Sequence, residues 1–108
     1  MIRVLFVPVG GTPTVVWIEP SLAAMQALVG GHIEATNPAR LLPRGVDLYC
    51  NEDGIERQLP PNGCGILGPY FFSAIDGRGE PRSLDAGELA AVSVFYLLHR
   101  DVRHPCAR

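Results

Sequence analysis

The residues best suited to chemistry are the histidines and cysteines, several of which lie near the C-terminus. His99, His104 and Cys106 are close in sequence, and a zinc site needs about four nitrogen or sulfur ligands. The chain has no Cys-x-x-Cys pair, and His99 falls at the end of an expected helix, where it would stabilise the helix dipole. We therefore predict neither a metal site nor a cofactor.

Cys50 and Cys64 are candidate nucleophiles, because a thiol beside a histidine and an orienting acid can attack a substrate. Cys50 falls in an alternating strand pattern, where a cysteine usually acts as a small apolar side chain. Cys64 lies between Gly63 and Gly65, which indicates a more exposed thiol, but no base lies near it in the sequence. A small enzyme that uses Cys64 is therefore the weaker hypothesis.

Four carboxylates form an acidic cluster, and paired acids can transfer protons or bind a hard cation. The cluster contains Asp47, Glu52, Asp53 and Glu56. Because Glu52 and Asp53 belong to an expected turn, solvated turn residues are the favoured interpretation. An enzyme that uses these acids stays open as the same weaker hypothesis.

Two glycine-rich segments have the composition of phosphate-binding loops but lack the required context. Gly63, Gly65 and Gly68 have dinucleotide-binding spacing, and Gly10–Gly11 follows an expected strand. A phosphate loop leads into a helix N-terminus. Neither segment is followed by an expected helix, and the chain has no lysine, so we predict no phosphate loop.

Polar and aromatic side chains near the expected turns are the candidate binding residues. Asn51, Glu52 and Asn62 could hydrogen-bond a small ligand, although asparagines at turns more often cap the backbone. Trp17 and Tyr70 could stack on a nucleotide-like ligand whose phosphate an arginine binds. These five residues form the predicted binding set.

The segment Leu89–Leu98 is apolar and is interrupted only by Ser93. A helix that is apolar all round is buried on several faces or meets a partner. The two interpretations are about equally supported, so an interface that uses Leu89, Val92, Phe95 and Tyr96 is predicted beside plain core packing.

Composition sets the class of protein. The 108 residues are 47% hydrophobic and 19% charged, which fits one globular domain over residues 1–108 with a flexible tail from about residue 100. A net charge of −2 argues against broad nucleic-acid binding. The longest apolar segment is too short to span a membrane, and three cysteines without a signal peptide indicate reduced thiols in the cytoplasm.

Hydrophobic patterning and turn residues predict a small α+β fold. We expect a mostly antiparallel sheet of five or six strands with two packed helices. The strands are expected at residues 3–7, 14–18, 32–36, 46–50, 55–59 and 70–75, and the helices at 21–29 and 85–99, with a loop at 37–45. Asp85 and Glu88 have capping-box spacing, although Val92–Tyr96 could also form a strand.

The order of these segments resembles a known family. The resemblance rests on Arg3–Pro8 with its glycine pair, Gly30–Glu34, the turn Asn51–Gly54, the segment Leu59–Asn62, and Phe71–Ile75 followed by Ser83-Leu84 and an acidic helix start. The family is one of short proteins of unknown function carried by phages, plasmids and high-GC bacterial chromosomes. The resemblance implies a mobile-element setting and assigns no catalytic residue.

These observations predict a non-enzymatic accessory protein of a phage or mobile element that binds and inhibits a host factor, such as a defence component. The alternative is an oligomeric sponge for a nucleotide-like small molecule. The expected partners are accordingly a host protein or a small ligand, and the apolar segment also allows a homodimer. We expect no contact with a membrane.

Overall fold

The computed structural model describes residues 1–102, which fold around one sheet. The elements in chain order are β1 (Ile2–Val7), β2 (Thr14–Ile18), α1 (Leu22–Val29), β3 (Ile33–Thr36), a 3-10 turn (Pro38–Arg40), β4 (Val46–Asn51), β5 (Tyr70–Ile75), β6 (Pro81–Arg82) and α2 (Ala86–His99). The 3-10 turn lies in the segment 37–45, which was predicted as a loop, and the short β6 lies where no element was predicted.

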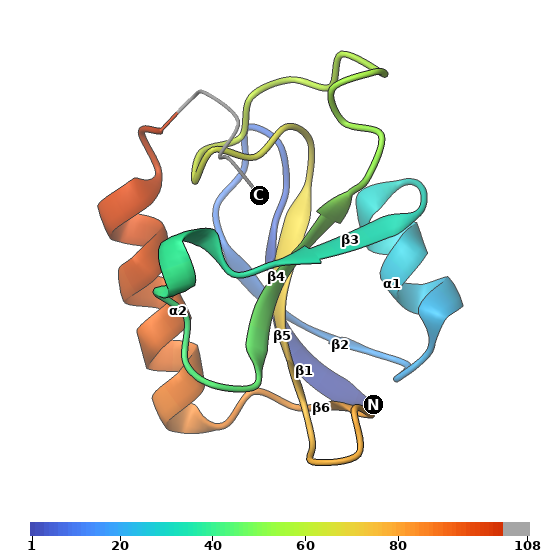
Figure 1. Ribbon diagram of the computed structural model, residues 1–108, viewed down its shortest axis with the longest axis vertical. Coiled ribbons are helices and arrows are strands. Elements are labelled where there is room, and N and C mark those ends of the chain that lie inside the picture. Colours follow the sequence, from blue (N-terminus) through green and yellow to red (C-terminus); the bar gives the residue numbers. More distant parts are fainter. Residues whose placement is uncertain (103–108) are drawn as a thin grey trace.

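The sheet has six strands in the order β2-β1-β5-β4-β3, with β6 beside β5 (Figure 1). Every pair is antiparallel. The predicted α+β fold, with a mostly antiparallel sheet and two helices, is confirmed. Because β5 pairs with β1 and β4, it lies at the centre of the sheet, and five of its six residues are buried.

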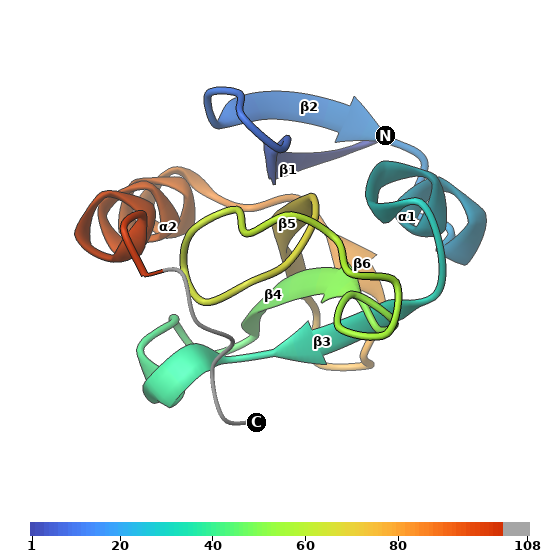
Figure 2. The ribbon, with the colours of Figure 1, turned by 90° about the horizontal axis from the view of Figure 1, so that it is seen from above.

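The two helices cover opposite faces of the sheet (Figure 2). Successive side chains of a strand point to opposite faces. Tyr70 and Phe72 accordingly pack in the core on the α2 side, and Phe71 packs with Met25 and Val29 of α1 on the other side. This two-sided burial explains why all residues of β5 except Ser73 are apolar or aromatic.

Capping residues set the ends of both helices. The hydroxyl of Ser21 accepts a hydrogen bond from the Ala24 N–H at the start of α1, and Gly30 ends that helix in the left-handed conformation. At the start of α2, Asp85 and Glu88 form the predicted capping box. The helix interpretation of residues 86–99 is therefore confirmed over the strand alternative.

The predicted strand at residues 55–59 is wrong, because this segment forms consecutive turns. Its N–H groups bond locally, from Arg57 to Asp53 O and from Gln58 to Ile55 O, at 2.9 and 3.0 Å. Gln58 has a φ of 53°, which breaks an extended chain. The segment is held instead by the Arg57 guanidinium, which donates to the carbonyl of Gly30.

The first residues of the expected tail, from residue 100 to residue 102, are hydrogen-bonded to the rest of the chain through Val102. Val102 donates its N–H to His99 O at 3.0 Å, and its carbonyl accepts from the Gly65 N–H at 3.1 Å. These bonds tie the end of α2 to the loop that contains Cys64. The rest of the expected tail lies outside the described residues.

Candidate functional site

The predicted polar cluster of Asn51, Glu52 and Asn62 does not form one site. The side-chain amides of Asn51 and Asn62 instead hydrogen-bond to backbone groups. Asn51 is buried, and it donates to the carbonyl of Val29 at 3.1 Å and accepts from the Asp53 N–H at 2.8 Å. It therefore joins the end of α1 to the turn after β4. The carboxylate of Glu52 lies in an exposed residue of that turn.

Asn62 and Tyr70 lie close together, and Tyr70 packs on the α2 side of the sheet. The Asn62 amide donates to the carbonyls of Val7 and Gly68, both at 3.0 Å, and the Tyr70 hydroxyl donates to Asn62 O at 3.3 Å. Burial, with a hydrogen bond to Cys64, raises the pKa of Tyr70. Because Tyr70 is fully buried, its predicted role as a stacking platform for a ligand is wrong.

Trp17 is the aromatic residue of the predicted binding set that is accessible to solvent, since 58% of it is exposed. Trp17 pairs with Arg3, and Val15 pairs with Leu5, whose side chain lies in the core on the α2 side. Residues directly opposite one another in a sheet share a face. Trp17 and Val15 therefore lie on the α2 side of the sheet, at its β2 edge.

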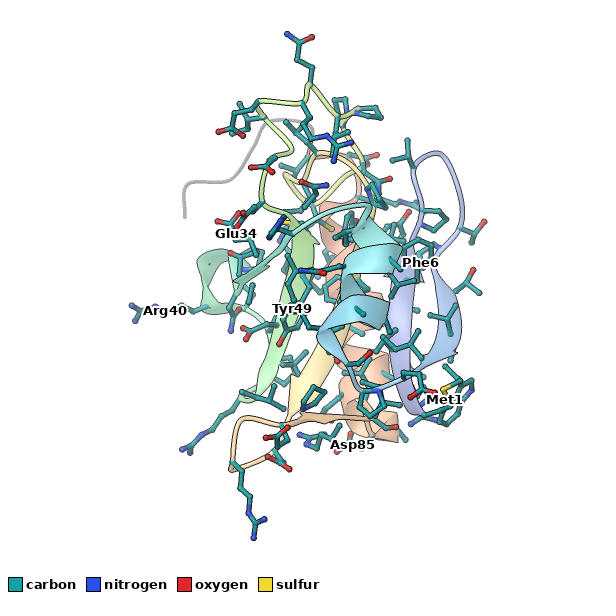
Figure 3. All side chains as sticks on the ribbon, turned by 90° about the vertical axis from the view of Figure 1, so that its right-hand side faces the viewer. Met1, Phe6, Glu34, Arg40, Tyr49 and Asp85 are labelled. Atoms are coloured by element: carbon teal, nitrogen blue, oxygen red, sulfur yellow. The ribbon has the colours of Figure 1, made fainter. Side chains whose placement is uncertain are left out.

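The four carboxylates of the acidic cluster do not converge. Burial raises the pKa of Asp47, which lies opposite Ser73 on the α1 side of the sheet. Figure 3 shows the neighbouring Tyr49 beside α1, with Phe6 on the other side of the helix. Burial and then the charge of Asp47 raise the pKa of Tyr49. The other three acids lie in the turns of residues 52–58, which follow β4.

The structure reverses the expectation for Cys64 and agrees with it for Cys50. Cys50 is fully buried in β4, as expected for a small apolar side chain. Cys64 was expected to be exposed, but only 2% of it is accessible. The neighbouring Gly63 instead lets this loop approach the end of α2 closely, because a Cβ at this position would lie 2.6 Å from the carbonyl oxygen of Arg100.

Two of the four predicted interface residues belong to the core. Val92 is fully buried, and Phe95 packs edge-on against Phe72 with ring centroids 5.9 Å apart. Their predicted contact with a partner is therefore wrong. Leu89 and Tyr96 pack against the same core and remain partly exposed.

The exposed apolar residues of α2 are different ones, which the sequence analysis did not single out. Val94, Leu97 and Leu98 lie at helical spacing on the outer side, where Leu97 is 57% and Leu98 is 74% exposed. Because α2 is apolar on almost all sides, its sequence contains no polar face that would mark the outside. Only the position of the sheet separates these residues from Val92 and Phe95.

A hollow of about 430 Å³ lies between the β1–β2 hairpin and α2. Gly11, Thr12 and Pro13 of the hairpin form one wall, and the other wall is formed by Ser93, Tyr96, Leu97 and Arg100 of α2. We call this hollow the hairpin–α2 groove. It combines apolar side chains with a phenol and a guanidinium.

Among residues 1–102, no group of three or more metal-binding side chains lies together. His104 and Cys106, which the sequence analysis considered as ligands, lie outside the described residues. In the same part of the chain, no helix has the length and apolar character needed to cross a membrane.

The fold and the groove define a class of protein: a small α+β domain with one helix on each face of its sheet. A groove lined by both apolar and polar side chains lies between its hairpin and α2. Its family is shown by a sequence profile, DUF3846, a domain of unknown function, which matches residues 2–93. The chain belongs to the DUF3846 family. Comparison with curated proteins found no match, and comparison with solved structures also found none.

Proposed function

We propose that this protein is an accessory protein of a phage or another mobile element and that it binds and inhibits a host protein through the hairpin–α2 groove. The observation that carries this proposal is the hollow between the hairpin and α2, which is lined by Tyr96, Arg100 and the exposed Leu97. The resemblance to short proteins of mobile elements supports the setting, and a defence component is the kind of host factor that such a protein would inhibit.

The chemistry of the groove suits a protein partner. Contiguous exposed apolar surface on a small domain commonly marks an interaction site. Binding energy in protein interfaces concentrates in Trp, Tyr and Arg side chains near a pocket. The groove offers Tyr96 and Arg100, and the exposed Trp17 lies on the same side of the sheet in β2. A side chain of the partner would enter the hollow while its neighbours cover the apolar rim.

The position of β2 adds a second mode of contact. It lies at the end of the strand order, so one side of its backbone has no neighbouring strand in the described sheet. Edge strands of this kind can pair with an extended segment of a partner. A partner strand beside β2 would bring its side chains next to Trp17 and Val15.

Affinity capture with paired surface variants tests the proposal. The full chain is used as bait in host lysate, and captured proteins are quantified by mass spectrometry. Trp17→Glu and Leu97→Asp should each lower the capture of the same host protein at least about tenfold, since each buries a charge in the interface. A purified host protein must then bind the wild type and lose activity.

The controls place the same change on exposed apolar residues elsewhere. Leu22→Asp on α1 and Ile55→Asp in the turns after β4 alter side chains with exposures close to that of Trp17. Both controls should capture the host protein as the wild type does. If no captured protein depends on Trp17 or Leu97, the proposal is wrong.

A nucleotide-like ligand is a second candidate, because Tyr96 and Arg100 line the same hollow. The phenol ring could stack on a base and the guanidinium could bind a phosphate. Native mass spectrometry of gently purified protein would then show a small-molecule mass on each chain. Arg100→Ala should lose that mass and Arg44→Ala, an exposed arginine outside the hollow, should keep it. A ligand-free mass would contradict this candidate.

A further inference from the structure

A second pocket lies on the other side of α2 and encloses about 300 Å³. It is separate from the hairpin–α2 groove. Its lining comes from the 3-10 turn and the residues after it, from the loop before β5, and from the end of α2: Pro38, Ala39, Leu41, Cys64, Phe95, His99 and Val102. We call it the Cys64–His99 pocket.

Unusual backbone conformations surround this pocket. The described chain has four non-glycine residues with a left-handed φ, among them Ala39 at 52°, Arg40 at 57° and Cys64 at 55°. Ala39 and Cys64 line the pocket from different segments, and Arg40 follows Ala39 and extends away from the molecule in Figure 3. Such a conformation is unfavourable for a residue with a Cβ and is retained only where neighbouring structure imposes it.

Hydrogen bonds fix both walls of the pocket. The Cys64 N–H donates to His99 O at 2.8 Å, which attaches the cysteine loop to the end of α2. On the opposite wall, the side-chain oxygen of Asn37 accepts from the Leu42 N–H at 2.9 Å and closes the segment that contains Ala39. The pocket is therefore largely preformed, as small-molecule sites usually are.

His99 supplies a defined polar group. Its Nδ1 lies 2.9 Å from the carbonyl oxygen of Phe95, and its ring stacks on the Phe95 ring with centroids 4.3 Å apart. Because a carbonyl only accepts hydrogen bonds, Nδ1 must carry the proton. In the neutral ring, Nε2 then keeps a lone pair and can accept a hydrogen bond from a ligand.

The rest of the lining determines what kind of ligand fits. Leu41 is 58% exposed at the rim, and Val102 is also exposed, so a ligand would cover apolar surface. Among the described residues that line the pocket, none is an Asp, Glu or Arg. A charged ligand would lose its hydration there without a charged partner, which disfavours a nucleotide.

We propose that the Cys64–His99 pocket binds a small, uncharged, mostly apolar molecule that donates one hydrogen bond to Nε2 of His99. Indole is a suitable probe, because it is neutral and mostly apolar and has a single N–H donor. The matched probe is 1-methylindole, which has the same ring without the donor. Both are added to the full chain, and amide signals are followed by NMR.

Indole should shift the amide signals of Ala39, Cys64, His99 and Val102, and it should bind about fivefold more tightly than 1-methylindole, the ratio expected for one net hydrogen bond. His99→Phe keeps a ring against Phe95 but removes Nε2, so the two probes should bind it equally. Leu41→Asp should weaken both probes, whereas Leu22→Asp, equally exposed on α1, should weaken neither.

A second measurement does not depend on the His99 variant. Saturating indole should slow the alkylation of Cys64 by iodoacetamide, measured by mass spectrometry of the Cys64 peptide. Equal binding of both probes to the wild type, or shifts confined to other amides, would overturn the proposal. Shifts of the same four amides that depend on protein concentration alone would assign the pocket to a second copy of the chain and would also overturn it.

Discussion

At the residue scale, buried amides and a tightly packed glycine determine where the loops lie. Asn51 and Asn62 each bond backbone groups from more than one segment, so their polar atoms serve the fold. Gly63 lets the Cys64 loop approach the end of α2 at a distance that no side chain permits. The sequence alone could not distinguish these roles from ligand binding, because both use the same groups.

Gly63→Ala should destabilise the protein by about 2–4 kcal/mol. The new Cβ would meet the Arg100 carbonyl, and the φ of 85° at this position is unfavourable for alanine. Urea denaturation measures the effect. Gly77→Ala is the matched control, because its Cβ would have no neighbour within 4 Å and should change stability by less than about 0.5 kcal/mol. Equal effects of the two substitutions would show that the close approach is not required.

At the element scale, the start of α2 depends on charge as well as on its cap. Glu88 completes the capping box with Asp85 and also binds both terminal nitrogens of Arg82, at 2.7 and 2.8 Å. The hydrogen bonds from Arg82 hold the pKa of Glu88 at about 2, well below its ordinary value. This carboxylate therefore links β6 to α2 while it stays ionised.

Glu88→Gln should change how stability depends on pH. A carboxyl group with a lowered folded-state pKa stabilises the protein above its ordinary pKa of 4.5, and this stabilisation is lost as the pH falls towards 2. The wild type should therefore lose part of its free energy of unfolding in this interval, about 1–3 kcal/mol for a hydrogen-bonded charge.

Denaturation at several pH values between 2 and 7 measures this dependence. Glu88→Gln should be less stable than the wild type at pH 7 and should lose less stability below pH 4.5. Glu80→Gln, an exposed acid in the preceding turn, is the control and should follow the wild-type curve. A Glu88→Gln curve parallel to that of the wild type would contradict the assignment.

At the scale of the whole molecule, the sheet divides α2 into a core side and an outer side. Phe95 packs against Phe72 and Leu98 faces outward, although both belong to the same apolar segment. The groove and the Cys64–His99 pocket then lie on the two flanks of this one helix. A partner in the groove and a ligand in the pocket would thus contact neighbouring turns of α2.

Phe95→Ala should lower the free energy of unfolding by about 3–5 kcal/mol, because it removes a buried ring and leaves a cavity. Leu98→Ala should change it by less than about 0.5 kcal/mol, because that side chain is already in solvent. Thermal and urea denaturation measure both variants. Comparable losses would mean that the outer side of α2 is buried in solution, as in a dimer.

Local patterns determined most of the secondary structure. The alternating and β-branched strands and the Asp85–Glu88 box are short-range signals, and the structure confirms them except at residues 55–59. Residues 55–59 were assigned wrongly, because their pattern allows a strand while local hydrogen bonds and the left-handed Gln58 favour turns.

The candidate sites were decided by tertiary structure alone. Cys64 and His99 are far apart in the sequence, yet they line one pocket because the Cys64 loop bonds to the end of α2. Pro13 and Leu97 line one groove because the hairpin and α2 meet on the same side of the sheet. The sequence determines which side chains are available, whereas the burial of apolar surface against the sheet decides which of them stay accessible and which become neighbours.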